Sequence, residues 1–160
     1  MTYWKENHKW IDKYRDQITS TLSRDLSSKV VAVIDVAVDE GVNYSTDRIF
    51  EMEGGKKVIT RLRKIEYMKY LEWTIVASRP SGVKTELSKL RDGFGDFYFY
   101  GYVNDTDVVK YFLFDLNLVR KKGILEWNFK ERTNRKDGSS FVVVPFNMLQ
   151  KCGALIREGP

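Results

Sequence analysis

The sequence predicts a single α+β domain, with a central mixed or antiparallel β-sheet flanked by helices, on three observations. Apolar residues near the N-terminus recur at spacings of three and four, which is typical of an amphipathic helix. Several later segments are rich in β-branched and aromatic residues, which is typical of strands. A second helical pattern interrupts those segments, and the order helix, strands, helix, strands fits this architecture. We expect the domain to span residues 1–160.

The first helix is predicted over about residues 3–23, and it contains His8, the only histidine. A lone histidine beside an apolar stripe is usually a packed or surface residue, although it can act as an acid or base. The β-branched run 29–38 predicts a buried strand, with a short buried helix as the alternative. Asp35 lies within this run. Burial of a carboxylate is costly unless it is paired or binds a metal, so Asp35 either has such a partner or faces water.

A β-hairpin is predicted next, with strands over residues 46–51 and 57–63 and a turn at Glu53-Gly54-Gly55, where glycines permit positive φ. The period of two places four first-strand residues on one face: Asp47, Ile49, Glu51 and Glu53. Arg61 and Arg63 share a face of the second strand. Two interpretations remain open: a solvated ladder of salt bridges, or a metal-binding Asp47 with cationic phosphate contacts beside it.

The rest of the chain continues the alternation of strands and helices. Residues 64–71 form an aromatic and basic connector that the pattern does not assign. Strands are predicted over 72–78, 96–103, 108–118, 125–130 and 140–144, and helices over 85–91 and after Pro145.

Three tyrosines, Tyr98, Tyr100 and Tyr102, share one face of the strand 96–103. Such a row can be a platform for stacked bases, or its rings can pack against a helix and the sheet. We expect the packed arrangement.

Composition and charge limit the function. The chain has 27 Lys and Arg against 22 Asp and Glu, a net charge of +5, which favours polyanionic partners. Cys152 is the only cysteine, so an intramolecular disulfide and a Cys-rich zinc site are excluded, and we expect Cys152 to be buried or incidental. No segment approaches the roughly 20 apolar residues of a membrane span, and we expect a soluble, cytoplasmic protein. Gly-rich phosphate loops, paired histidines and serine-hydrolase elbows are absent from the sequence.

The order of these segments resembles the core of the PD-(D/E)XK nuclease superfamily. The resemblance rests on the first helix, Asp47 in a Ser-Thr-Asp strand, the Gly-Gly turn, a basic strand, a further strand and the helix after Lys84. The phrases beginning at Glu72, Gly95 and Asp115 are also similar to small phage-encoded proteins grouped near those nucleases. The resemblance covers about residues 4–120.

The resemblance implies a Mg²⁺ site. In that superfamily an aspartate on one strand and an acidic residue followed two positions later by lysine hold the metal and help activate water. Asp47 matches the aspartate, whereas the next strand has Ile59-Thr60-Arg61, or Arg61-Leu62-Arg63, where Glu-x-Lys or Gln-x-Lys is expected. The missing acidic role can pass to one of four glutamates: Glu6, Glu51, Glu72 or Glu86. Arg61 can supply the cation that lysine usually supplies.

Two function hypotheses follow. The first is a metal-dependent nuclease acting on DNA, with Asp47, Arg61 and Glu72 as catalytic residues and Asp47 and Glu51 as Mg²⁺ ligands. Its nucleic-acid contacts are expected from basic side chains on and after the hairpin: Arg61, Arg63, Arg79 and Lys84. The second, favoured by the missing Glu-x-Lys, is a catalytically inactive nucleic-acid-binding or protein-interaction module on the same scaffold.

Overall fold

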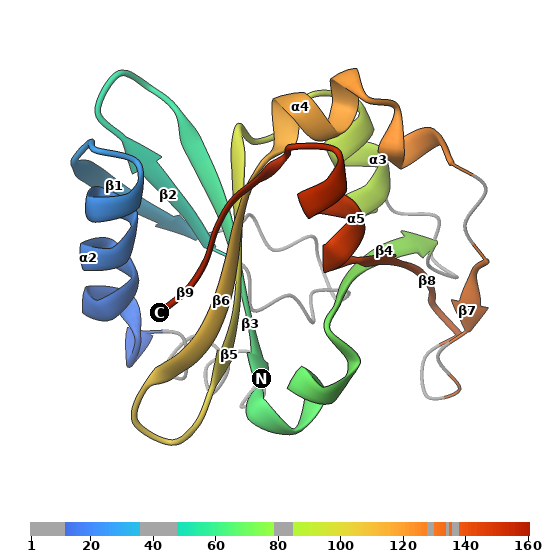
Figure 1. Cartoon of the computed structure of the whole chain (residues 1–160), viewed down its shortest axis with the longest axis horizontal. Helices are drawn as coiled ribbons and strands as arrows, with labels where there is room; N and C mark the ends of the chain where they lie inside the picture. The colour runs from blue at the N-terminus through green and yellow to red at the C-terminus, as the bar shows by residue number, and fades with distance from the viewer. Residues whose placement is uncertain (1–11, 36–47, 79–84, 128–129, 134, 136–137) are drawn as a thin grey trace.

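The computed structural model describes residues 12–35, 48–78, 85–127, 130–133, 135 and 138–160 (Figure 1). The predicted α+β fold with a central mixed sheet is confirmed. A six-stranded sheet has the order β1-β2-β3-β5-β6-β9, and a three-stranded sheet has the order β4-β8-β7.

The strands of the large sheet are β1 (Val30–Asp35), β2 (Arg48–Met52), β3 (Lys57–Lys64), β5 (Phe97–Val103), β6 (Val108–Asp115) and β9 (Leu155–Gly159). Those of the small sheet are β4 (Glu72–Ser78), β7 (Arg132–Thr133) and β8 (Ser140–Pro145). The helices are α2 (Arg15–Asp25), α3 (Glu86–Arg91), α4 (Leu116–Lys121) and α5 (Phe146–Lys151), with 3₁₀ helices η1 (Ile65–Tyr70) and η2 (Ile124–Glu126).

The predicted hairpin is confirmed as β2 and β3. Its antiparallel ladder pairs Arg48 with Thr60 and Glu51 with Lys57. Gly54 and Gly55 form the turn with φ of +89° and +90°, values that a residue with a Cβ rarely adopts. Strand β3 then pairs in parallel with β5, and a parallel pair requires a crossover connection, which here contains η1, β4 and α3.

Helices and the small sheet cover the two faces of the large sheet (Figure 1). On one face, α2 buries Ile18 and Leu22 against a cluster that includes Phe50 and Phe99. On the other face, the small sheet and helices α3, α4 and α5 pack around the fully buried Trp73. Side chains of β3 and β5 alternate between these two clusters, as the period of two predicts.

The tyrosine row belongs to the second cluster. Tyr98, Tyr100 and Tyr102 are 0%, 1% and 1% exposed, which confirms the packed arrangement. Tyr98 stacks on Phe114 with ring centroids 5.2 Å apart. These rings are therefore part of the core, and no base can reach them in this structure.

Two strand predictions differ from the structure, and strands β7 and β9 were not predicted. The strand predicted over 108–118 ends at Asp115, because the Asp115 carboxylate accepts hydrogen bonds from the amides of Asn117 and Leu118 and caps α4. The strand predicted over 125–130 is wrong at its start, where Leu125 is buried within η2. Strand β9 was not predicted, because its alternating pattern is short and contains Arg157 and Glu158.

Candidate nucleic-acid interface

Two arginines of β3 point to the same face of the sheet and have different surroundings. Arg61 is level with Tyr100 of β5, and Arg63 is level with Tyr102. The residue Arg61 is only 8% exposed, whereas Arg63 lies at the edge of the fold, where β3 leads into η1. This difference decides which of the two can meet a ligand.

The guanidinium of Arg61 is held inside the protein. Its Nη1 donates to the Thr74 carbonyl oxygen at 2.7 Å, and its Nη2 lies 3.0 Å from Oε1 of Glu86. Thr85 positions that glutamate, since its hydroxyl accepts from the Ser88 amide at 3.4 Å and caps α3. The arginine is therefore satisfied by a carbonyl and a carboxylate from two other elements.

Residues of β5 and β4 also contact the Glu86 carboxylate. The Tyr98 hydroxyl donates to its Oε2 at 2.7 Å, and the Val76 amide lies 3.4 Å from its Oε1. We call Arg61, Glu86 and Tyr98 the buried polar cluster. It connects β3, β4, α3 and β5, and a phosphate could bind Arg61 only by displacing Glu86, which would leave a buried carboxylate unpaired.

Around Arg63 the surface combines aromatic, aliphatic and basic side chains. The Arg63 guanidinium lies over the Tyr67 ring, 4.5 Å from its centroid, and Lys69 Nζ is 5.2 Å from the centroid of Tyr70. We call this surface the η1 patch; its members are Arg63, Lys64, Ile65, Tyr67, Lys69, Tyr70 and Leu71. Four of them are large hydrophobic residues with exposures between 42% and 56%: Ile65, Tyr67, Tyr70 and Leu71.

The exposure of the η1 patch follows from the local structure. Helix η1 contains no buried residue, and the partly buried Met68 is its contact with the core. Leu71 has a left-handed φ of +46°, which turns the chain from η1 into β4. Burial raises the pKa of the neighbouring Tyr102 phenol, whereas the positive charge of Arg63 acts to lower it.

Two of the acidic residues predicted for the site, Glu51 and Glu72, have partners other than Arg61 in the described part of the chain. Glu51 lies opposite Lys57 in the register of the hairpin. At a rise of roughly 3.3 Å per residue, the Cα of Lys57 is about 13 Å from that of Arg61. Oε1 of Glu72 lies 3.8 Å from Arg132 of β7. The acid that pairs with Arg61 is Glu86, one of the four glutamates that the resemblance allowed.

Several predicted residues lie outside the described part of the chain: Glu6, His8, Asp47, Arg79 and Lys84. Within the described part, no group of three His, Cys, Asp or Glu side chains could hold a metal ion. Glu86 is engaged by Arg61 and Tyr98, and Asp47, on which the implied Mg²⁺ site is centred, is one of the residues outside the described part.

The sequence of the η1 patch carries a signal of its exposure. Residues 63–71 place basic side chains close to aromatic ones, as in Lys69-Tyr70. Such a segment exposes rings, and exposed rings beside cations are candidates for base stacking.

None of the helices in the described ranges is long and apolar enough to cross a membrane. Comparison of the chain with models of known families, with curated proteins and with solved structures gives no significant match.

Proposed function

We propose that this protein binds single-stranded nucleic acid through the η1 patch. The observation that carries the proposal is the pair of exposed tyrosines, Tyr67 and Tyr70, each with a cation beside its ring. Exposed rings between basic side chains are the usual elements of surfaces that bind single strands without strong sequence preference. The net charge of +5 also favours binding of a polyanion such as nucleic acid.

Each component has a separate physical role. A base stacked on an aromatic ring contributes about 1–3 kcal/mol, and it can do so only when it is not stacked within a duplex. Arg63 and Lys69 are placed to meet the phosphates that flank such a base. Glu66, exposed on the same 3₁₀ helix, opposes them and limits affinity. We therefore expect modest, salt-dependent binding that prefers single strands to duplex.

The test is fluorescence anisotropy with a labelled oligothymidylate, comparing the wild type with Tyr67→Ala/Tyr70→Ala. The matched control is Trp127→Ala, which removes a ring that is 49% exposed and lies after η2. We expect the double variant to lose at least about tenfold in affinity and the control to stay within about twofold. Equal affinity of all three proteins would refute the proposal. An RNA oligomer of the same sequence compares the two sugars.

A second candidate function is metal-dependent cleavage of DNA, as in the superfamily that the sequence resembles. Its support is the order of elements, since α2, the β2–β3 hairpin, β4 and α3 follow one another as the resemblance implies. The test incubates supercoiled and single-stranded DNA with Mg²⁺ or Mn²⁺ and compares Asp47→Ala with the wild type. Loss of cleavage in the variant supports this function, whereas absent cleavage, or cleavage unchanged in Asp47→Ala, contradicts a site built on Asp47.

A further inference from the structure

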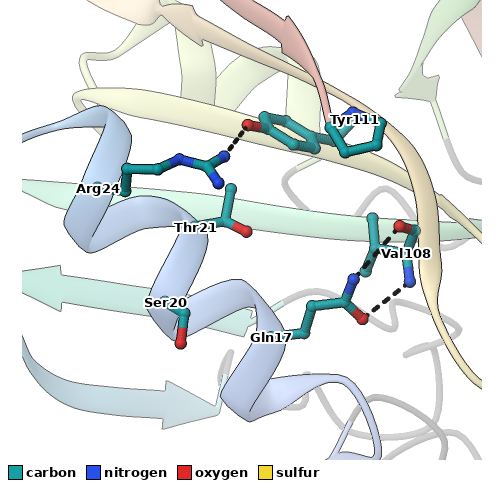
Figure 2. Close-up of a pocket in the computed structure, with 7 residues that line it drawn as sticks. Gln17, Ser20, Thr21, Arg24, Val108 and Tyr111 are labelled. Carbon is teal, nitrogen blue, oxygen red and sulfur yellow. Dashed lines mark hydrogen bonds between the residues drawn. The ribbon is translucent and has the colours of Figure 1, made fainter.

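A pocket of 480 Å³ lies between α2 and β6, on the face of the large sheet opposite the buried polar cluster (Figure 2). It is lined by Gln17, Ser20, Thr21, Arg24, Val108, Tyr111 and Pro160. The volume is within the range of small-molecule sites, about 300–1,000 Å³. The helix contributes an amide, two hydroxyls and a guanidinium, so its wall of the pocket is polar.

A buried carboxylate at the end of α2 fixes one side of this pocket. The Asp25 side chain is 2% exposed, and its Oδ2 accepts a hydrogen bond from the Tyr111 hydroxyl at 2.5 Å. Its Oδ1 accepts from Nε of Arg24 at 3.0 Å and lies 3.6 Å from Nε of Arg157. The two arginines outnumber the carboxylate, so the group as a whole is positive.

Tyr111 completes the support of Arg24. Because its proton is donated to Asp25, its oxygen is free to accept from Nη2 of Arg24 at 2.9 Å. Burial, together with the hydrogen bond to Asp25, raises the pKa of Tyr111. The ring is also fixed, since it stacks on Phe99 with centroids 4.9 Å apart.

These contacts leave part of the Arg24 fork unused. Nε and one Nη2 hydrogen are engaged, and Nη1 points toward Thr21 in Figure 2. At the far end of the pocket, the Gln17 amide pairs with both backbone groups of Val108, at 3.0 and 3.3 Å. Gln17 therefore uses its amide oxygen and one amide hydrogen on Val108, and the other side chains of α2 that line the pocket are Ser20, Thr21 and Arg24.

We propose that this pocket binds a small molecule through an oxyanion group, a phosphate or a carboxylate, held by Arg24 with Ser20 and Thr21. A guanidinium oriented by a carboxylate and a phenol loses little freedom on binding, and it matches the two oxygens of an oxyanion in a bidentate contact. Asp25 positions Arg24 and does not contact the ligand. The proposal is independent of the η1 patch, because the two sites lie on different faces of the sheet.

The experiment titrates the full chain with inorganic phosphate, and separately with acetate, at constant ionic strength set with chloride. Amide chemical shifts in ¹H–¹⁵N spectra report the position of binding. We expect saturable shifts at α2 and β6, and the stronger of the two ligands identifies the preferred oxyanion. Arg24→Gln should weaken that binding by about tenfold or more. Lys121→Gln, the same charge change on the exposed surface of α4, should leave it unchanged.

Arg24→Gln also removes a partner of the buried Asp25, so circular dichroism is used to check that the variant folds. If Arg24→Gln does not fold, Arg24→Lys is used in its place. Lysine keeps the positive charge but lacks the bidentate fork, so binding should again weaken. Unsaturable shifts spread over the surface, or equal responses of the wild type, Arg24→Lys and Lys121→Gln, would overturn the proposal.

Discussion

Arg61 and Arg63 lie on one face of one strand, and their surroundings give them opposite roles. Arg61 has exchanged water for the Thr74 carbonyl and Glu86, whereas Arg63 lies over an exposed tyrosine ring. Removing a charge from water costs several kcal/mol unless partners replace the lost hydration, so a buried arginine is committed to those partners. An arginine at the edge keeps its hydration and can exchange it for a phosphate.

The comparison shows that a basic side chain on a strand does not by itself indicate a nucleic-acid contact. What matters is whether the fold has already supplied its counterion. For Arg61, that counterion comes from α3, which is 25 residues away in the sequence and reaches β3 only through the crossover. Arg63 is located before η1, where the chain leaves the core.

The largest effect should come from breaking the buried polar cluster. Glu86→Gln leaves Arg61 without its carboxylate, and we expect a loss of about 3–5 kcal/mol in the free energy of unfolding, measured by urea denaturation. Glu158→Gln is the control, because it breaks an exposed pair, with Lys110 at 2.7 Å, and should cost less than about 1 kcal/mol. Equal costs would show that Arg61 is as hydrated as a surface residue.

Replacing the whole ion pair sharpens this prediction. Arg61→Met/Glu86→Met removes both charges, and apolar replacement of a buried pair is often close to neutral. We therefore expect the double variant to be more stable than Glu86→Gln. A double variant that is less stable would mean that the charges contribute more than their burial costs.

The second largest effect concerns binding at the η1 patch. Tyr67→Ala and Tyr70→Ala should each weaken binding of single-stranded DNA by about 1–3 kcal/mol, because each removes one stacking surface. Neither ring is buried, so the unfolding free energy should change by less than about 0.5 kcal/mol. Anisotropy and urea denaturation of the same preparations separate the two effects. A stability loss equal to the loss in binding would place the rings in the core instead.

The sequence was most informative where one physical rule acts alone. The alternation of Phe97–Val103 predicted both its strand and the burial of its tyrosines, and Gly54-Gly55 predicted the hairpin turn. Local competition was harder to predict. Asp115 ends β6 because its side chain caps α4, an outcome that depends on hydrogen bonds formed only after the chain turns.

The candidate site was less predictable than the fold. The pairing of Arg61 with Glu86 depends on the crossover between parallel strands, and spacing along the chain does not specify which of several glutamates arrives. The same crossover leaves η1 at the surface. Spacing gave the correct face for both arginines, and tertiary packing decided their exposure.

Asp96 is a partly buried carboxylate, and we expect its replacement to change stability less than breaking the buried polar cluster does. Partial burial acts to raise its pKa, but the Lys57 amide at 2.9 Å, Asn117 at 3.2 Å and the nearby cations Lys56 and Arg120 outweigh this, and the pKa is lowered. A lowered folded pKa stabilises the protein above the unfolded value of about 3.9, and that stability is lost as the pH falls through the folded value.

Asp96→Asn tests how much the charged carboxylate contributes to stability. The variant should be less stable by about 1–2 kcal/mol at pH 7, because hydrogen bonds to a charged acceptor are lost. The difference should shrink as the pH falls from about 4, the unfolded pKa, through the lowered folded pKa, below which the wild-type carboxyl is protonated and resembles the amide. Thermal unfolding of both proteins between pH 7 and pH 2.5 measures it. A difference that stays constant over this range would assign the effect to packing instead of charge.

The smallest effect should distinguish Arg63 from Arg61 in binding itself. Arg63→Gln removes one phosphate contact, and the slope of log K against log salt should decrease in magnitude by about 0.7 for a single strand. Arg61→Met should leave the slope unchanged in the fraction that stays folded, because that guanidinium is already paired with Glu86. Anisotropy titrations at several KCl concentrations give both slopes. If Arg61→Met lowered the slope and Arg63→Gln did not, the phosphate would be meeting the buried arginine, and Glu86 would have to move away from Arg61 when nucleic acid binds.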